Sequence, residues 1–178
     1  MSIMHFEKIT REQWVKDMVN LLSLEHPTAE NFRDINKLYD GIKLPKRATK
    51  HSAGYDFYVS GDVIIPIKDS GIIPTGIRWV CDKEEDKNKV LQLYPRSGIG
   101  FRTGLRLMNT VGIVDADYWE SNNEGHIMLK LYNPMDSPLH IEYGGAIVQG
   151  VITEYHTCDD EEEIVEKRTG GMGSTDKE

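Results

Sequence analysis

The chain has 178 residues and carries 29 acidic against 21 basic side chains, a formal net charge of −8. This length predicts one domain that buries about two-thirds of its unfolded surface, and the acidic balance excludes nonspecific nucleic-acid binding, which needs clustered Lys and Arg. A small polyphosphate ligand is still compatible with this charge, because a few arginines and a divalent cation can hold one in an acidic protein.

Residues 1–41 are predicted to form a helical N-terminal extension. Thr10 and Gln13 have the spacing of a capping box, and a second helix is expected to begin after the cap residue Thr28 and to stop at Gly41. Apolar side chains recur at helical spacing in both segments, which predicts packing faces rather than chemistry. These side chains are Trp14, Met18 and Leu21 in the first helix and Phe32, Ile35 and Leu38 in the second.

Residues 42–157 are predicted to form a β domain. Short β-branched or aromatic runs alternate here with turn residues such as Asp69–Gly71. Because no helical pattern separates these runs, we expect an all-β antiparallel sandwich or barrel. The predicted strands are Val63–Ile67, Ile72–Val80, Val90–Tyr94, Leu105–Met108, Ile127–Tyr132, Leu139–Tyr143 and Ala146–Tyr155.

Residues 158–178 combine an acidic linker, Asp159–Glu163, with a glycine-rich C-terminal arm, Arg168–Glu178. Glycines let backbone N–H groups approach a ligand closely, and the arginine and hydroxyl side chains of the arm add donors suited to phosphate. The same composition is also typical of an ordinary disordered C-terminus.

The chain is predicted to be cytoplasmic. It contains no apolar run long enough for a membrane helix and does not open with a charged-then-apolar leader, so we expect neither a membrane span nor secretion. Cys81 and Cys158 stand far apart, and neither they nor the six histidines have metal-ligand spacing. A disulfide or zinc framework is therefore not expected, and a reducing compartment fits.

Three further clusters of polar residues lie in the β region. Ala53–Asp56 places a carboxylate beside a glycine at the start of a strand, and Pro95–Gly98 presents a guanidinium and a hydroxyl on a turn. Asn109–Tyr118 is an apolar, hairpin-like stretch with an amide at one end and two carboxylates and a phenol at the other. Taken singly, each cluster is a weak signal.

Together with the arm, these clusters resemble the five ordered motifs of the homotrimeric dUTPase family, the deoxyuridine 5′-triphosphate nucleotidohydrolases. The segments Lys46–Asp56 and Asn123–His126 are most similar to the forms found in Gram-positive bacteria and their phages. The likeness covers residues 42–175 in order and spacing. The five motifs correspond here to Ala53–Phe57, Pro95–Gly100, Asn109–Tyr118, Gly144–Gln149 and Arg168–Thr175.

The resemblance implies a Mg²⁺-dependent dUTP diphosphatase, a hydrolase that splits the phosphoanhydride bond of dUTP to give dUMP and pyrophosphate. It further implies a jelly-roll-like β fold and a homotrimer whose active sites are each built from more than one subunit, with the C-terminal arm closing over a site formed by its neighbours. This activity would limit uracil incorporation into DNA and supply dUMP for dTTP synthesis.

The expected phosphate-handling residues fit the chemistry. In-line hydrolysis needs a base to orient water and cations to absorb phosphate charge. Asp115 is expected to activate the water, and Asp56 to hold Mg²⁺ through bound water. Arg96 supplies positive charge, while Ser97 and the Gly98 amide donate hydrogen bonds to phosphate oxygens. Gln149 matches a family position near the phosphates.

Base and sugar selection would fall to the third motif. Asn109 offers a donor and an acceptor that complement the uracil edge, and the backbone around Val111, Gly112, Ile113 and Val114 leaves little room at uracil C5. Tyr118 resembles the ring that packs under deoxyribose and excludes a 2′-hydroxyl; its alternative role is that of a core aromatic. Met128 matches a position that lines the same site.

The arm would complete the site. Arg168 is expected to bind the terminal phosphates, Met172 to cover the uracil face, and Gly173, Ser174 and Thr175 to donate to the remaining oxygens. Two residues depart from the family pattern. Ala146 replaces the usual arginine of the fourth motif, and Met172 replaces the usual uracil-stacking aromatic.

Two rival functions share parts of this pattern. dCTP deaminase has the same fold and arginine–serine motif, but usually uses a glutamate base. A second rival is a regulatory protein that binds dUTP and docks to a repressor, as some phage members of the family are thought to do. Residues 1–40 and the Trp119–Glu124 insertion are places where such a partner could bind.

Overall fold

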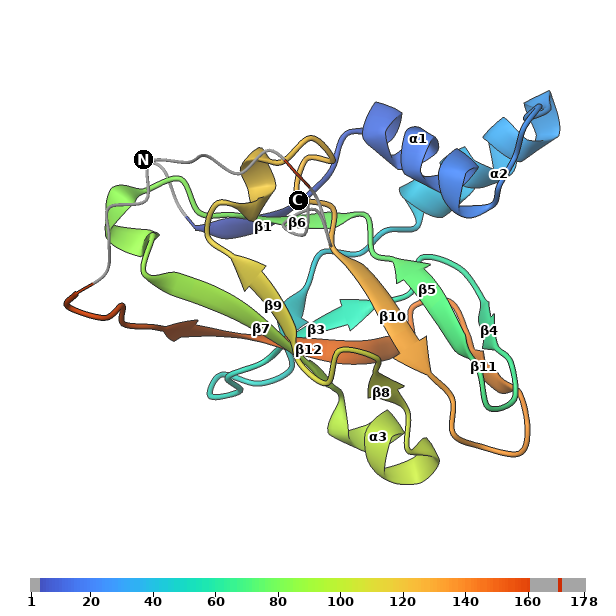
Figure 1. Ribbon diagram of the computed structural model, residues 1–178. Helices are drawn as coiled ribbons and strands as arrows, with labels where there is room; N and C mark the ends of the chain where they lie inside the picture. Colours follow the sequence, from blue (N-terminus) through green and yellow to red (C-terminus); the bar gives the residue numbers. More distant parts are fainter. Residues whose placement is uncertain (1–3, 161–169, 171–178) are drawn as a thin grey trace.

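The computed structural model describes residues 4–160 and residue 170 of the chain (Figure 1). Within these residues, strands dominate, with three α-helices and two short 3₁₀ turns. In chain order the elements are β1 His5–Lys8, α1 Arg11–Leu21, α2 Ala29–Asp40, β2 Lys46–Arg47, β3 Tyr55–Tyr58, β4 Val63–Ile65, β5 Ser70–Pro74, β6 Ile77–Val80, η1 Glu84–Asp86, β7 Lys89–Pro95, α3 Ser97–Thr103, β8 Arg106–Leu107, β9 Gly112–Asp115, η2 Tyr118–Glu120, β10 Met128–Tyr132, β11 Leu139–Ile141 and β12 Ala146–Glu154.

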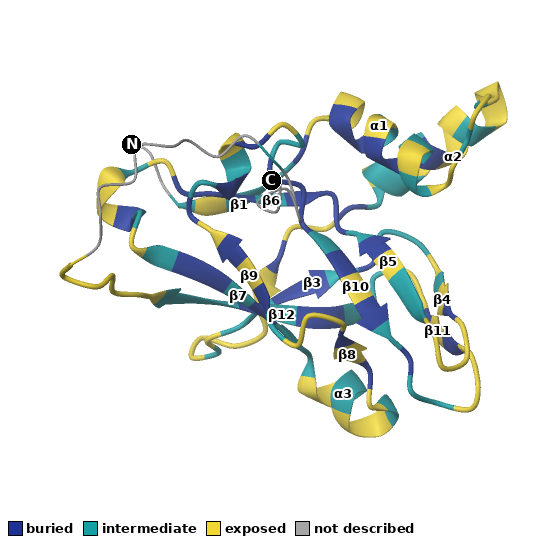
Figure 2. Ribbon diagram, in the orientation of Figure 1, coloured by how far each residue is buried: buried dark blue, intermediate teal, exposed yellow. Residues whose placement is uncertain are grey.

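The strands pair antiparallel into four sheets, which confirms the predicted antiparallel β class. The largest has the order β2-β3-β12-β7-β9, and a three-stranded sheet has the order β5-β10-β8. Two-stranded sheets join β1 to β6 and β11 to β4. The buried faces of these sheets meet in one apolar core, visible as dark blue in Figure 2. Within the described residues, no helix is long and apolar enough to cross a membrane.

The N-terminal helices form where local sequence chemistry predicts them. The Thr10 side chain accepts a hydrogen bond from the Gln13 backbone N–H at the start of α1. A reciprocal capping box with Asn31 fixes Thr28 at the start of α2, and Gly41 caps its end. The two helices pack through the fully buried Trp14, whose Nε1 donates to the Ile35 carbonyl at 2.9 Å. Truncation of such a side chain typically costs about 3–5 kcal/mol, so α1 is firmly anchored.

One part of the N-terminal segment differs from the prediction of a helical extension. Residues His5–Lys8 form β1, which pairs with β6. Its Phe6 ring packs on Phe57 with ring centroids 5.5 Å apart, and Glu7 accepts a hydrogen bond from Arg78 at 2.7 Å. These partners lie about 50 to 70 residues away in the sequence, so the local pattern of apolar residues could not predict strand β1.

Two predictions inside the β domain are also corrected. The run Ile72–Val80 is two strands, because Gly76 has a φ of +68° and bends the chain between β5 and β6. Pro95–Gly98 is not a simple turn: Ser97 begins helix α3, which ends at Gly104 in the left-handed region. Glycines at positions 98 and 100 lower helix propensity, which is why the sequence pattern did not indicate this helix.

Candidate functional site

A cavity of about 530 Å³, here called the nucleoside pocket, opens between β9, β10 and the segment that precedes β9. Its size suits one small ligand. It brings together six of the predicted nucleoside-binding residues, namely Asn109, Gly112, Ile113, Val114, Tyr118 and Met128. The seven other lining residues, which were not predicted as site residues, are Ile72, Leu93, Leu107, Met108, Ile127, Leu129 and Lys130.

The entrance segment of the nucleoside pocket is held in an unusual backbone conformation. Thr110 has a φ of +66°, which is uncommon for a β-branched residue. The Val111 N–H donates to the Asn109 carbonyl at 2.7 Å and closes a three-residue γ-turn around Thr110. Such conformations persist where the surrounding structure fixes them and are frequent at ligand sites. The turn therefore holds Asn109 at the mouth of the pocket.

Tyr118 is buried, and both functions of its hydroxyl group are used. Its Oη donates to the His126 carbonyl at 3.1 Å, and it accepts a hydrogen bond from Asn123 Nδ2 at 3.1 Å. The ring has an exposed fraction of 5% and lines the nucleoside pocket. It thus belongs to the core and to the pocket at once, and its position is fixed.

The predicted phosphate-binding residues form a second group, here called the phosphate cluster. Arg96 Nε donates to Asp56 Oδ1 at 3.1 Å. In the central sheet, Gln149 of β12 is paired with Asp56 of β3. A Cβ atom placed on Gly54 would lie 2.6 Å from Gln149 Oε1, so only glycine lets this amide lie against the chain. Strands β3, β12 and β7 therefore bring Asp56, Gln149 and Arg96 together.

Tyr58 is a neighbour of this cluster that the sequence analysis missed. Burial, together with the charge of Asp56, raises the pKa of the Tyr58 phenol, while Arg96 lowers it. The net direction is upward, so Tyr58 is a neutral hydroxyl at physiological pH and can act as a hydrogen-bond donor. Its signal in the sequence was its place two residues after Asp56, on the same strand.

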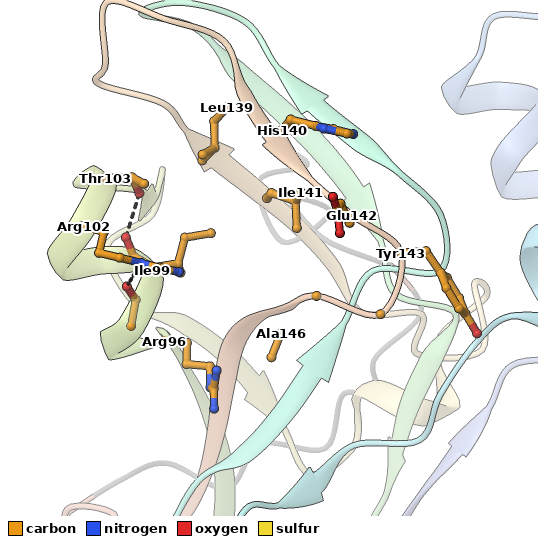
Figure 3. Close-up of a pocket in the computed structure, with 13 residues that line it drawn as sticks. Arg96, Ile99, Arg102, Thr103, Leu139, His140, Ile141, Glu142, Tyr143 and Ala146 are labelled. Atoms are coloured by element: carbon orange, nitrogen blue, oxygen red, sulfur yellow. Dashed lines mark hydrogen bonds between the residues drawn. The ribbon is translucent and has the colours of Figure 1, made fainter.

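A cavity of about 710 Å³ adjoins the phosphate cluster between α3 and the segment from β11 to β12 (Figure 3). Arg96, Gly98 and Arg102 line one side, and a Cβ atom added to Gly98 would meet nothing within 4 Å. Arg102 Nε donates to the Gly98 carbonyl at 2.8 Å. Ala146, which stands where the family pattern has arginine, lines the same cavity. Arg102 is thus a second guanidinium here, and the sequence analysis did not identify it.

Asp115 and Arg96 lie far apart within one chain. In the β7–β9 ladder, Asp115 is paired with Val90, and Arg96 follows Val90 by six residues along β7 and just beyond it. At about 3.3 Å per extended residue, the two Cα atoms are separated by about 20 Å. The two cavities also have no described lining residue in common. One chain therefore carries the nucleoside pocket and the phosphate cluster at two separate places.

Five predicted site residues lie outside the described residues: Arg168, Met172, Gly173, Ser174 and Thr175. Val111 adjoins β9, and Asp115 is exposed at its end. Among residues 4–160 and 170, there is no group of three or more His, Cys, Asp or Glu side chains that could hold a metal ion.

This chain is similar to known proteins of one family. The dUTPase family profile matches residues 40–176. A deoxyuridine 5′-triphosphate nucleotidohydrolase of Lactococcus lactis is 41% identical over 137 residues, which are 76% of this chain and 89% of the relative.

Solved structures show the same relationship. The crystal structure of dUTPase from Streptococcus mutans is 31% identical, with a TM-score of 0.63, and the match covers 87% of this chain and 98% of that one. A mutant dUTPase from phage phi11 of S. aureus, described with a structural Mg(II) ion, is 20% identical and shares the fold, with a TM-score of 0.58 over 75% of this chain and 96% of that one. With its profile match and its Gram-positive relatives, this chain belongs to the dUTPase family.

Proposed function

We propose that the protein hydrolyses dUTP to dUMP and pyrophosphate in the cytoplasm, limiting uracil incorporation into DNA and supplying dUMP for dTTP synthesis. Membership of the dUTPase family supports this activity. The observation that carries it is the nucleoside pocket, where the Asn109 amide and the buried ring of Tyr118 line one cavity. An amide can pair with the uracil edge, and a fixed ring under the sugar leaves no space for a 2′-hydroxyl.

The reaction needs a water molecule in line with the α–β phosphoanhydride bond. Asp115 is the proposed base, because a carboxylate at the exposed end of β9 can orient and deprotonate a water beside the nucleoside pocket. Arg96, Ser97 and the Gly98 amide are proposed to donate to the phosphate oxygens, where charge grows as the leaving pyrophosphate departs. Arg102 can supply the cationic contact that Ala146 lacks, since both line the same cavity.

The residues present fit a Mg²⁺ ion bound mainly through substrate. Asp56 uses Oδ1 for Arg96, and its second oxygen can accept a hydrogen bond from a metal-bound water. Such an ion keeps several waters and binds mainly through phosphates, so it needs few ligands from the protein. When bound, Mg²⁺ would neutralise part of the triphosphate charge.

We further propose that the active site is shared between subunits of a homotrimer. The separation of about 20 Å between Asp115 and Arg96 is too long for both to act on one phosphoanhydride bond, so the phosphate cluster of one subunit must meet the nucleoside pocket of another. Apolar side chains near these half-sites are exposed in the single chain, Phe101 at 93% and Ile113 at 57%. Burying them between subunits would stabilise the assembly.

Trimerisation is therefore expected at micromolar concentration. Multi-angle light scattering should give three times 20.3 kDa, about 61 kDa. A mass of one chain in the presence of dUTP would contradict the shared site. Charged substitution of Phe101, as in Phe101→Glu, should shift the mass toward the monomer, whereas Phe32→Glu on α2 serves as a control at a partly exposed aromatic outside the β domain.

The assay that tests the proposed activity separates it from the closest rival. Pyrophosphate release from dUTP, dCTP, dTTP and UTP with Mg²⁺ should be fast for dUTP alone. Release of ammonia from dCTP would instead assign the protein to deamination. A regulatory role in docking to a repressor is a second property that could coexist with hydrolysis, and binding of a purified repressor with and without dUTP would test it.

A further inference from the structure

We infer that helix α1 positions the sugar-discriminating ring of the nucleoside pocket, acting through Asp17 and His126. Asp17 belongs to α1, and His126 lies between η2 and β10. Both are positioning residues that reach the substrate through Tyr118. This inference rests on the proposed function, in which Tyr118 packs under deoxyribose.

The side chain of His126 is completely buried, and both of its ring nitrogens have partners. The Gly76 N–H donates to Nε2 at 2.9 Å, and Nδ1 lies 2.7 Å from Asp17 Oδ2. A backbone N–H can only donate, so Nε2 is the acceptor and carries no proton. The proton of the neutral ring is therefore on Nδ1, from which it is donated to Asp17. One backbone group and one carboxylate thus fix the tautomer and the ring orientation.

Asp17 is held just as firmly from the other side. Gln13 Nε2 donates to Asp17 Oδ1 at 2.8 Å, so each carboxylate oxygen has a donor. The Trp14 ring lies beside the imidazole, with ring centroids 5.8 Å apart. A buried carboxylate with fewer partners would be costly. The face of α1 formed by Gln13, Trp14 and Asp17 is therefore shaped to receive His126.

The backbone of His126 links these contacts to the nucleoside pocket through Tyr118. Its carbonyl accepts the hydrogen bond from Tyr118 Oη at 3.1 Å, and Asn123 from the same loop donates to Tyr118 Oη at 3.1 Å. The path from α1 to the ring therefore consists of hydrogen bonds between buried or partly buried groups. If the His126 carbonyl shifted, the Tyr118 hydroxyl would have to follow it to keep this hydrogen bond, and the Tyr118 ring would move as well.

A second contact holds the same loop to the start of α1. Glu124 accepts hydrogen bonds from the Thr10 N–H at 2.8 Å and the Thr10 hydroxyl at 2.7 Å. Glu124 has a φ of +56°, and the next residue, Gly125, has a φ of +70° with room only for a glycine against Trp119. This left-handed pair is a costly conformation for Glu124, and its double contact with Thr10 offsets that cost.

The α1 part of this contact network lies outside the stretch that the family profile matches. Residues Arg11–Leu21 of α1 lie before residue 40, where the family profile begins to match. The N-terminal segment of this chain therefore has a role in substrate selection in addition to its packing. That role predicts a change in the preference for deoxyribose when the contact between Asp17 and His126 is broken.

The experiment compares Asp17→Ala and Asp17→Asn with the matched control Tyr39→Phe. The alanine variant loses both carboxylate contacts, and the asparagine variant keeps the size but loses one acceptor oxygen. Tyr39→Phe removes a different hydrogen bond of the N-terminal helices, from Tyr39 Oη to the Ile9 carbonyl at 2.8 Å. All variants are tested as full-length chains for melting temperature and, by calorimetry, for the ratio of Kd values for UMP and dUMP.

We expect Asp17→Ala to lower the preference for dUMP over UMP about threefold to tenfold, because a displaced ring reopens part of the space for a 2′-hydroxyl. Asp17→Asn should lower the preference for dUMP less than Asp17→Ala does. Tyr39→Phe should keep the parental ratio of Kd values, even if its melting temperature falls by as much as that of the Asp17 variants. Nitrogen chemical shifts of His126 should show the Nδ1–H tautomer in the parent and loss of that fixed state in Asp17→Ala.

The outcomes separate this inference from the proposed function. If Asp17→Asn and Asp17→Ala both fold and both keep the parent's preference for dUMP over UMP, the inference is overturned, even if the parent hydrolyses dUTP. A parent that prefers dUMP but releases no pyrophosphate from dUTP would overturn the proposed hydrolysis. In that case, a ratio that still depends on Asp17 would support the positioning role by itself.

Discussion

Replacing Asp115 with asparagine is expected to lower the turnover of dUTP by about 10² to 10⁴, the usual contribution of a general base. The amide keeps the size of the carboxylate but cannot take a proton from water. Asp115 is exposed at the end of β9, so the substitution leaves the core untouched, and folding and dUTP affinity should change little. Single-turnover measurement of pyrophosphate release, together with the Kd of a non-hydrolysable dUTP analogue, separates the two effects.

Asp117→Asn is the matched control for this prediction. It makes the same change of charge two residues further along, just before η2, where no part of the proposed reaction takes place. Its turnover should stay within about threefold of the parent, as is usual for substitutions away from the reacting groups. Turnover of Asp115→Asn within tenfold of the parent would remove Asp115 from the role of base.

Deleting residues 168–178 is expected to abolish most turnover while leaving the trimer folded. The deletion removes Arg168, Ser174 and Thr175, the donors proposed for the terminal phosphates. It also removes Met172, proposed to cover the uracil face with a polarisable thioether. Closure of an arm over a bound triphosphate excludes bulk water and strengthens the polar contacts inside. The last strand of the central sheet ends at Glu154, so we expect the fold to survive the deletion.

Two controls distinguish a functional arm from a simple tail. A shorter deletion, of residues 176–178, leaves Arg168–Thr175 in place and should keep parental activity. Arg168→Ala should weaken dUTP binding, whereas Lys167→Ala changes the neighbouring charge and should have little effect. If the protein lacking residues 168–178 hydrolysed dUTP as fast as the full chain, the arm would have no part in the reaction.

The parts of the fold that the sequence could predict are those set by interactions between residues close together in the chain. The caps at Thr10 and Thr28 depend on side chains three residues away, and both helices begin where these caps place them. Strand β1 could not be predicted in this way, because its stability comes from pairing with β6 and from Phe6 packing on Phe57. Helix α3 was not predicted, because its two glycines give the segment a low helix propensity.

The candidate site shows the same division. The ordered motifs led to Asn109 and Tyr118, which the fold then brings into one pocket. Arg102 could not be predicted as a site residue, because helix α3, which places it in the lining of the cavity, was itself not predicted. The contact between Asp17 and His126 joins residues 109 positions apart, and only the three-dimensional structure reveals that α1 reaches the loop behind Tyr118.

The most direct test of the account is a mixing experiment with two inactive variants, Asp115→Asn and Arg96→Ala. Each variant damages one half-site and leaves the other intact. In trimers reassembled at random from equal amounts, about a quarter of the shared sites would combine an intact phosphate cluster with an intact nucleoside pocket. Pyrophosphate release from dUTP should therefore recover to about a quarter of the parental rate, whereas a mixture as inactive as its separate components would show that each chain holds a complete site of its own.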